Sequence, residues 1–294
     1  MKRYIEKNPI IMIVIGVLGI SLSSIFVKLS LAPSSVTAAY RLTWTVALMV
    51  PIVMGKRTVR QELLQINRKA LILSCVSGLF LAIHFILWFE SLFFTSVASS
   101  TTIVCTEVIW VSLGFCLFLK GHLTRKAVGA IGVTLIGSIL IAYVDSTVGS
   151  MQLYGDILAL LAAIAVAVYV LIGGIVRKQV STTVYTFIVY GSCAIILLLV
   201  CMIQGYGLFE YGWSAVIVGF LLAVFSTILG HSIFSWCLKY FSPSFVSASK
   251  LCEPVVAAIL AIFIFHEMPT ILQILGSILI VGGVFYYSKI EQAS

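Results

Sequence analysis

The sequence predicts an all-α membrane protein with ten transmembrane helices. Apolar residues make up 61% of the 294 residues, and charged residues only 10%. The mean hydropathy is +1.18. Soluble domains contain about 25% charged and about 45–50% apolar residues, so this chain could not cover its surface with polar groups.

Apolar segments of about 20 residues recur along the whole chain. A helix rises about 1.5 Å per residue, so this length crosses about 30 Å of hydrocarbon while pairing its backbone groups. We expect helices at 9–31, 35–54, 71–93, 97–119, 126–143, 155–176, 183–203, 213–238, 244–265 and 270–288. The first follows Met1-Lys2-Arg3 without an Ala-x-Ala-like cleavage site, so we interpret it as a transmembrane helix rather than a signal peptide. The longest connection, about 55–70, is basic and polar.

Lysine and arginine gather on one side of the predicted membrane. With a cytoplasmic N-terminus, the inner segments hold 15 of the 18 basic residues and the outer loops hold none. The inner residues are Lys2, Arg3, Lys7, Lys56, Arg57, Arg60, Arg68, Lys69, Lys120, Arg125, Lys126, Arg177, Lys178, Lys239 and Lys289; the outer acids are Asp145, Asp156, Glu210 and Glu267. This predicts cytoplasmic N- and C-termini in a cell (plasma or inner) membrane. The inner position of the basic residues also explains the net charge of +8, without nucleic-acid binding. Contact of these residues with membrane lipid is a weaker alternative.

Several functional motifs are absent from the sequence. The seven cysteines lie in apolar segments without CxxC or His/Cys spacing, so we expect no metal site and no cofactor. HExxH and GxSxG are absent, which argues against an intramembrane enzyme. GxxxxGK[ST] is also absent, which argues against ATP-driven transport by this chain alone.

The two halves of the chain contain an internal repeat. At an offset of 147 the pairs are His84 with His231, Cys105 with Cys252, and Gly129 with Gly276; one residue of slip pairs Glu107 with Glu253. Five predicted helices precede five more, and five is odd, so the second set enters the membrane from the opposite side. We therefore expect inverted repeats at 1–147 and 148–294, with the site near the midplane between them.

The second half of the chain carries a series of short motifs that resemble those of a known protein family. They are Cys237-Leu238-Lys239-Tyr240-Phe241, Cys252-Glu253-Pro254-Val255, Phe265-His266-Glu267, Gly276-Ser277 and Gly282-Gly283. This run resembles the closing motif of EamA-domain proteins, which belong to the drug/metabolite transporter superfamily. The likeness implies ten helices in two EamA repeats, a central cavity, and transport of small metabolites, usually outward.

The first half carries a looser copy of the same motifs. It comprises Ser91-Leu92, Thr95-Ser96-Val97-Ala98, Glu107 and Leu119-Lys120-Gly121. It departs from the family at Val108, where proline is frequent, and at Gly121, where glutamate is usual. Lys28 and Arg41 also match positions that are often basic in this family.

Six charged residues fall inside predicted helices: Lys28, Arg41, Glu90, Glu107, Lys250 and Glu253. Each costs about 2.5–3.5 kcal/mol at mid-membrane, so we expect them to face the bundle interior.

Glu253 lies near half depth in the ninth helix, with Lys250 three residues before it. Pro254 removes a backbone donor and frees a carbonyl near Lys250, which predicts a break that lines a cavity. Two interpretations stay open. Lys250 and Glu253 form a pair that only fixes the bend, or Glu253 binds substrate or accepts a proton.

Glu107 lies near half depth in the fourth helix and has no basic neighbour on its own face. Its partner must come from another helix or from substrate, so Glu107 is the stronger candidate for substrate binding. Trp110 shares its face, and a carboxylate beside an indole suits a cationic or amine-bearing ligand. Ordinary packing is the alternative for Trp110.

His84, with Trp88 one turn later, and His231 occupy the third and eighth helices. A histidine, with a reference pKa of about 6.5, can relay protons. A neutral hydrogen bond between helices is the alternative.

Glu90, Lys28 and Arg41 lie toward the outer ends of their helices. A pair between Glu90 and either base would form an outer gate. Snorkelling of the two bases to the interface is the alternative.

Small residues concentrate in the fifth and tenth helices: Gly129, Gly132, Gly137, Gly276, Ser277, Gly282 and Gly283. They permit close helix packing, within the chain or in a homodimer.

Together these features predict a secondary transporter that works by alternating access. Glu107 and Glu253 would flank the site, with Trp88, Trp110 and His84 lining it. The substrate would be a small metabolite, such as an amino acid, an amine or a related compound, and export is preferred through the resemblance. A proton-coupled importer is the alternative, followed by a channel or an intramembrane enzyme.

Overall fold

The computed structural model describes residues 9–146, 150–266 and 268–293. Every regular element among these residues is helical, which confirms the all-α class. In this part of the chain, eight helices are long and apolar enough to cross a membrane, as in a multi-pass membrane protein. Lys2, Arg3, Lys7 and Glu267, which enter the topology prediction, lie outside the described residues, as does the predicted boundary at 147/148.

The helices follow one another with short connections, and their ends lie mostly within a few residues of the predicted ones. In chain order they are α2 (Pro9–Ser21), α3 (Ser23–Lys28), α4 (Ser34–Gly55), α5 (Arg57–Gln65), α6 (Arg68–Phe94), α7 (Val97–Val104), α8 (Glu107–Leu119), α9 (Arg125–Ser146), α10 (Ser150–Val176), α11 (Thr182–Ile203), α12 (Gly212–Leu221), the π-helix η1 (Leu222–His231), α13 (Ser232–Cys237), α14 (Pro243–Ser249), the 3-10 helix η2 (Lys250–Cys252), α15 (Glu253–Phe265) and α16 (Ile271–Ala293).

The ninth predicted helix breaks where the proline signal places the break. The chain tightens into η2 over Lys250–Cys252, and α15 then begins at Glu253 with Pro254 in its first turn. The Lys250 carbonyl, released from the α-helical pattern, accepts from the Glu253 backbone N–H and from the Cys105 Sγ, 3.8 Å away.

The fourth predicted helix is also broken, which the sequence analysis did not foresee. Its two parts, α7 and α8, meet at Cys105 and Thr106. The Thr101 hydroxyl donates to the Val97 carbonyl at 2.6 Å, and the Thr106 hydroxyl donates to the Ile103 carbonyl at 2.7 Å. Such hydroxyls compete with backbone donors for the same carbonyls and loosen a helix without proline.

Two further departures from regular helix occur near the bundle centre. The first predicted helix is interrupted at Leu22, and the eighth contains the π-helix η1, which ends at His231. Wide turns of this kind often occur at functional sites. The backbone of η1 lies so close to α2 that a Cβ added at Gly19 would lie 2.7 Å from the Phe225 carbonyl oxygen.

The 55–70 connection is not wholly irregular, because residues Arg57–Gln65 form the short helix α5. The Glu62 carboxylate accepts a hydrogen bond from the backbone N–H of Ser181 at 2.6 Å. This bond ties α5 to the start of α11.

The broken helix pairs of the two halves have equivalent landmarks. Ser96 and Ser242 each cap the first part, accepting from the backbone N–H three residues on. Glu107 and Glu253 each begin a 13-residue second part. Lys120 and His266 each end it in the left-handed region, with φ of 52° and 56°. Each pair is separated by 146 residues (for example 253 − 107), which matches the offset inferred for the glutamates.

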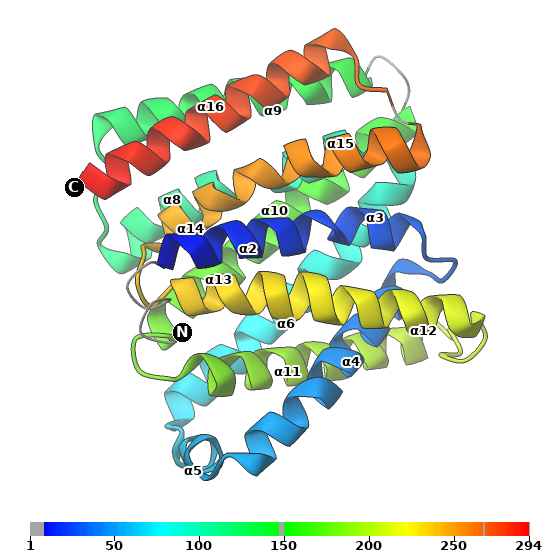
Figure 1. Cartoon of the computed structure of the whole chain (residues 1–294), viewed down its shortest axis with the longest axis vertical. Coiled ribbons are helices and arrows are strands. Elements are labelled where there is room, and N and C mark those ends of the chain that lie inside the picture. The colour runs from blue at the N-terminus through cyan, green and yellow to red at the C-terminus, as the bar shows by residue number, and fades with distance from the viewer. Residues whose placement is uncertain (1–8, 147–149, 267, 294) are drawn as a thin grey trace.

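Helices α9 and α16 lie side by side at one edge of the bundle, and the start of α2 and the end of α16 lie on the same side of the molecule (Figure 1). Small residues make the α9–α16 contact close. A Cβ added at Gly137 would lie 2.6 Å from the Gly276 carbonyl oxygen, and one added at Gly283 would lie 2.5 Å from the Thr134 Oγ1. Gly129 and Gly132 face open space instead.

Candidate functional site

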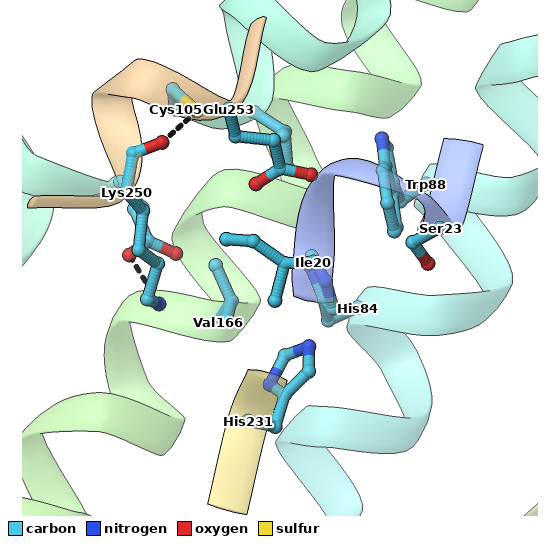
Figure 2. A pocket seen from close by; sticks show the side chains of 11 residues that line it. Ile20, Ser23, His84, Trp88, Cys105, Val166, His231, Lys250 and Glu253 are labelled. Atoms are coloured by element: carbon cyan, nitrogen blue, oxygen red, sulfur yellow. Dashed lines mark hydrogen bonds and ion pairs between the residues drawn. The ribbon is translucent and has the colours of Figure 1, made fainter. Parts of the chain in front are cut away.

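A small cavity, lined by both apolar and charged side chains, lies at the centre of the bundle, where the helix interruptions meet (Figure 2). Its walls come from α2, α3, α6, α7, α8, α10, η1, η2 and α15. The lining residues are Ile20, Ser23, His84, Trp88, Val104, Cys105, Glu107, Val166, His231, Lys250 and Glu253. The space open to the centre of a water-sized sphere is about 30 Å³. A water needs about 10–15 Å³ on this measure, so the cavity holds a few waters at most and is closed to a metabolite.

One wall of the cavity is a buried ion pair between the two halves of the chain. The Lys250 Nζ lies 2.6 Å from the Glu107 Oε1, and the two side chains are only 7% and 6% exposed. Glu107 therefore finds its partner on another helix, as one of the sequence alternatives required. The interpretation that Lys250 pairs with Glu253 to fix the bend is wrong, because the ammonium reaches across to α8.

Glu253 faces the same cavity and is 6% exposed. Among the described residues its carboxylate has no ion pair and no side-chain hydrogen-bond donor. The sequence analysis had favoured Glu107 as the uncompensated carboxylate, and the structure reverses that order. A buried carboxylate without a protein partner is costly, so it calls for a proton, a water or a ligand cation.

His84, Trp88 and His231 form an aromatic cluster on the opposite wall (Figure 2). The His84 ring stacks on Trp88, with ring centroids 5.7 Å apart and planes inclined by 19°. The ring centroids of His231 and His84 lie 6.4 Å apart, so the two histidines related by the repeat lie next to each other at the cavity. The His84 Nδ1 lies 3.0 Å from the Ala162 carbonyl oxygen, which can only accept, so this nitrogen carries the proton.

Arg41 is fully buried, so snorkelling to the membrane interface, one of the two alternatives for this residue, is wrong for Arg41. Its Nε donates to the Thr227 Oγ1 at 2.8 Å and its Nη1 donates to the Ser23 Oγ at 3.0 Å. The guanidinium also lies over the Phe85 ring, 4.2 Å from its centroid.

The predicted outer gate between Arg41 and Glu90 is not formed, because both Arg41 hydrogen bonds go to hydroxyls. Glu90 instead accepts from the Ser34 hydroxyl at 2.6 Å. The Lys28 ammonium lies over the Phe265 ring, 5.5 Å from its centroid.

Trp110 does not reach the central cavity. It lines a separate apolar groove between α8, α9 and α10, together with Leu113, Leu135 and Ile139. Glu107 lines the central cavity, whereas Trp110, three residues later on α8, is turned by about 60° around the helix axis and lies toward α9 and α10.

The sequence analysis missed several residues of the cavity wall. Ser23 comes from the interruption between α2 and α3, and Cys105 from the break between α7 and α8. The serines among residues 21–24, inside an otherwise apolar helix, could have indicated the interruption near Ser23. Within the described part of the chain, no group of three or more His, Cys, Asp or Glu side chains could hold a metal ion.

A cluster of tyrosine and serine hydroxyls separates the cavity from the end of the bundle where α10 meets α11. The Tyr169 hydroxyl lies 2.9 Å from the Ser235 Oγ, and the Tyr185 hydroxyl lies 2.8 Å from the Ser77 Oγ. The Arg177 Nε donates to the Ser235 carbonyl at 2.9 Å. These bonds connect α6, α10, α11 and α13, so opening this side requires several helices to part.

Comparison with known proteins identifies this architecture. A model of the EamA-like transporter family matches the chain twice, over residues 7–143 and 153–289. The chain belongs to the EamA-like transporter family. It is therefore a member of the drug/metabolite transporter superfamily with two EamA repeats, as its motifs indicated.

Two curated relatives come from Bacillus subtilis (strain 168). The chain is 25% identical over 221 residues to the protein named Uncharacterized transporter YxxF, covering 74% of this chain and 70% of the relative. It is 25% identical over 202 residues to Uncharacterized transporter YdfC, covering 67% of this chain and 64% of that protein.

A solved crystal structure shares the fold of this EamA-family chain. The two superpose with a TM-score of 0.74, over 97% of this chain and 99% of the other, at 16% sequence identity. This similarity supports the fold alone.

Proposed function

We propose that the protein is a secondary transporter that moves a small metabolite across the cytoplasmic membrane by alternating access. The solute would be an amino acid, an amine or a related compound, and its direction would be outward, as the family resemblance suggests. The protein would release the solute chemically unchanged. The observation that carries the proposal is the closed cavity at the centre of the bundle, where the Lys250–Glu107 pair and Glu253 meet.

The cavity supports a carrier rather than a channel. It has room for a few waters only. The hydrogen bond between Tyr169 and Ser235 also holds α10 against α13. A solute of metabolite size can enter only if helix groups move apart. Balanced charges in the interior and a repeated architecture suit such rocking around a fixed site.

The finer topology is part of the same proposal. We place ten spans in two inverted repeats divided near 147/148, with α9 and α16 as the fifth and tenth spans and both termini cytoplasmic. Support comes from the two family matches and from the start of α2 and the end of α16 lying on the same side (Figure 1). The open faces of Gly129 and Gly132 leave room for a homodimer contact.

Counterflow in proteoliposomes tests the proposal. Vesicles loaded with unlabelled solute should take up labelled solute transiently and saturably, and the recovered solute should be unchanged. Glu253→Gln and Glu107→Gln should each lower this exchange at least about tenfold, since each removes a charge from the site. Exchange at the wild-type rate in both variants would refute the proposal. Non-saturable flux would indicate a channel, and an altered product an enzyme.

A thermal-shift screen of amino acids and amines on purified protein would choose the solute for this assay. Binding to the folded state raises the melting temperature by mass action.

A further inference from the structure

Helix α5 lies at the membrane surface, because membrane-length helices precede and follow it directly. The apolar helix Ser34–Gly55 ends just before α5, which covers Arg57–Gln65, and the apolar helix Arg68–Phe94 begins just after it. In Figure 1, α5 is seen end-on while the long helices run across the picture, so its axis lies along the membrane surface. A helix of nine residues held at both ends in this way stays at the interface.

Two of the three faces of α5 contact the rest of the protein. Val59 and Leu63 pack against the hydrophobic core. On the second face, the Glu62 carboxylate accepts from the Ser181 backbone N–H at 2.6 Å, and Glu62 and Gln65 line a polar crevice. These contacts fix the rotation of α5 about its own axis, so they also decide which side chains point away from the protein.

The third face of α5 consists of Arg57, Arg60 and Leu64, and all three side chains are exposed. An α-helix turns by about 100° per residue, so the three fall within about 60° around the axis, with Leu64 between the two arginines. Leu64 is 78% exposed. In interfacial helices, apolar side chains enter the boundary between headgroups and acyl chains, while arginines keep their charge at the headgroups.

The charge around this third face is strongly positive. The exposed basic residues in and beside α5 are Lys56, Arg57, Arg60, Arg68 and Lys69. Glu62 is the only acidic residue between positions 55 and 70 of the sequence, and its carboxylate is directed to the Ser181 N–H. Clusters of lysine and arginine beside a membrane span attract anionic lipid headgroups. The surface of α5 therefore matches a partner that is both anionic and apolar.

We propose that Arg57 and Arg60 of α5 bind the phosphate groups of anionic phospholipids, with Leu64 inserted between the acyl chains. The lipid phosphate supplies the negative charge and its chains supply the apolar contact. A free phosphate ion satisfies only the arginines, and a zwitterionic lipid carries a positive group that offsets its phosphate. This inference goes beyond the transport proposal, since it depends neither on the solute nor on the direction of transport.

Lipid titrations of the purified protein in detergent test this assignment. The melting temperature would be measured against phosphatidylglycerol or phosphatidylcholine with the same short acyl chains. Half of the stabilisation should need at least about tenfold less phosphatidylglycerol, because each arginine near an anionic surface contributes about fivefold to binding. Arg57→Gln with Arg60→Gln should remove most of this preference. Arg125→Gln with Lys126→Gln, an exposed basic pair at the start of α9, should keep it within about twofold.

A fluorescent label reports whether Leu64 enters the lipid. In protein without its own cysteines, Leu64→Cys and Gln65→Cys would each carry one dye in vesicles that contain phosphatidylglycerol. The two positions are adjacent but about 100° apart around α5, and Gln65 lines the polar crevice. Brominated acyl chains should quench the dye at Leu64→Cys at least about threefold more than the dye at Gln65→Cys. Aqueous iodide should show the opposite order.

Neither measurement requires flux, so its outcome is independent of the transport proposal. Equal stabilisation of the wild type by both lipids, or an unchanged preference in the Arg57 and Arg60 double variant, would overturn the inference. Equal stabilisation by sodium phosphate or glycerol 3-phosphate at the same concentration would also overturn it, because the surface would then bind a free ion. Stronger iodide quenching at Leu64→Cys would place this face in water, where only a soluble acidic partner could reach it.

Discussion

The Lys250 ammonium of the second repeat contacts the Glu107 carboxylate of the first at 2.6 Å, inside the membrane bundle. The pair joins η2 to α8 at the two helix breaks. Glu253, the repeat equivalent of Glu107, faces the cavity and has no such partner among the residues that the structure describes. One architecture thus gives its two glutamates different chemistry, and the predictions below follow from that difference.

Glu107→Gln should destabilise the protein strongly, because it leaves the Lys250 charge buried and unpaired. Breaking a buried pair on one side costs about 3–5 kcal/mol. The double variant Glu107→Gln with Lys250→Met should be less destabilised than the sum of the two single variants. Melting temperatures in detergent would measure this cycle, and additive effects would show that the two side chains do not interact.

Glu253→Gln should leave stability close to that of the wild type, since this carboxylate has no ion pair to lose. It should nevertheless abolish most counterflow, because the site loses its acceptor charge. The comparison with Glu107→Gln in the same two assays separates a structural carboxylate from a binding one. A large fall in melting temperature for Glu253→Gln would contradict this division.

Cys105 should report on opening of the cavity. Its side chain is 3% exposed and lines the wall, whereas Cys193 is fully buried away from it. In variants that retain a single cysteine, a small water-soluble thiol reagent should modify Cys105 faster during transport than at rest. Cys193 is the matched control and should stay unmodified under both conditions. Equal rates at rest and during transport would argue against alternating access.

Gly19→Leu should disrupt the contact between α2 and η1, where an added Cβ would lie 2.7 Å from the Phe225 carbonyl oxygen. Backbone atoms cannot yield as a side chain can, so the expected cost is at least about 1–3 kcal/mol. Gly132→Leu is the control, because a Cβ there meets nothing within 4 Å. The two variants should differ clearly in melting temperature, and similar values would refute the close packing of α2 on η1.

Much of the fold could be predicted because the lipid environment restricts the secondary structure that a membrane-spanning segment can adopt. Apolar segments of membrane length must be helical, and the repeat offset could be found from His84, His231 and the two glutamates. The break at Pro254 was also predictable, since proline lacks the donor that a helix needs there. The break at Cys105 and Thr106 was not, because it arises from hydroxyls that compete for carbonyls, and many threonines in helices do not break them.

The sequence predicted most of the named residues that line the central cavity, but not which of these side chains contact one another. His84, Trp88, Glu107 and Glu253 do line the cavity, and Trp110 does not. Glu107 and Trp110 both belong to α8 and lie about 60° apart around its axis, so which of them meets the cavity depends on how α8 packs against α9 and α10. The burial of Arg41 was likewise out of reach, because Thr227 lies 186 residues away in the chain.

The amino-acid sequence by itself determined that this chain is a helical membrane protein with two related halves and an unusual glutamate in each. Composition and spacing suffice for that, because exposing polar backbone or charge to the hydrocarbon core is costly whatever the tertiary structure. Only the tertiary structure decided which glutamate is neutralised. Lys250 is three residues from Glu253 along the chain, yet its ammonium lies against Glu107, because the packing of the two repeats brings a second carboxylate within 2.6 Å.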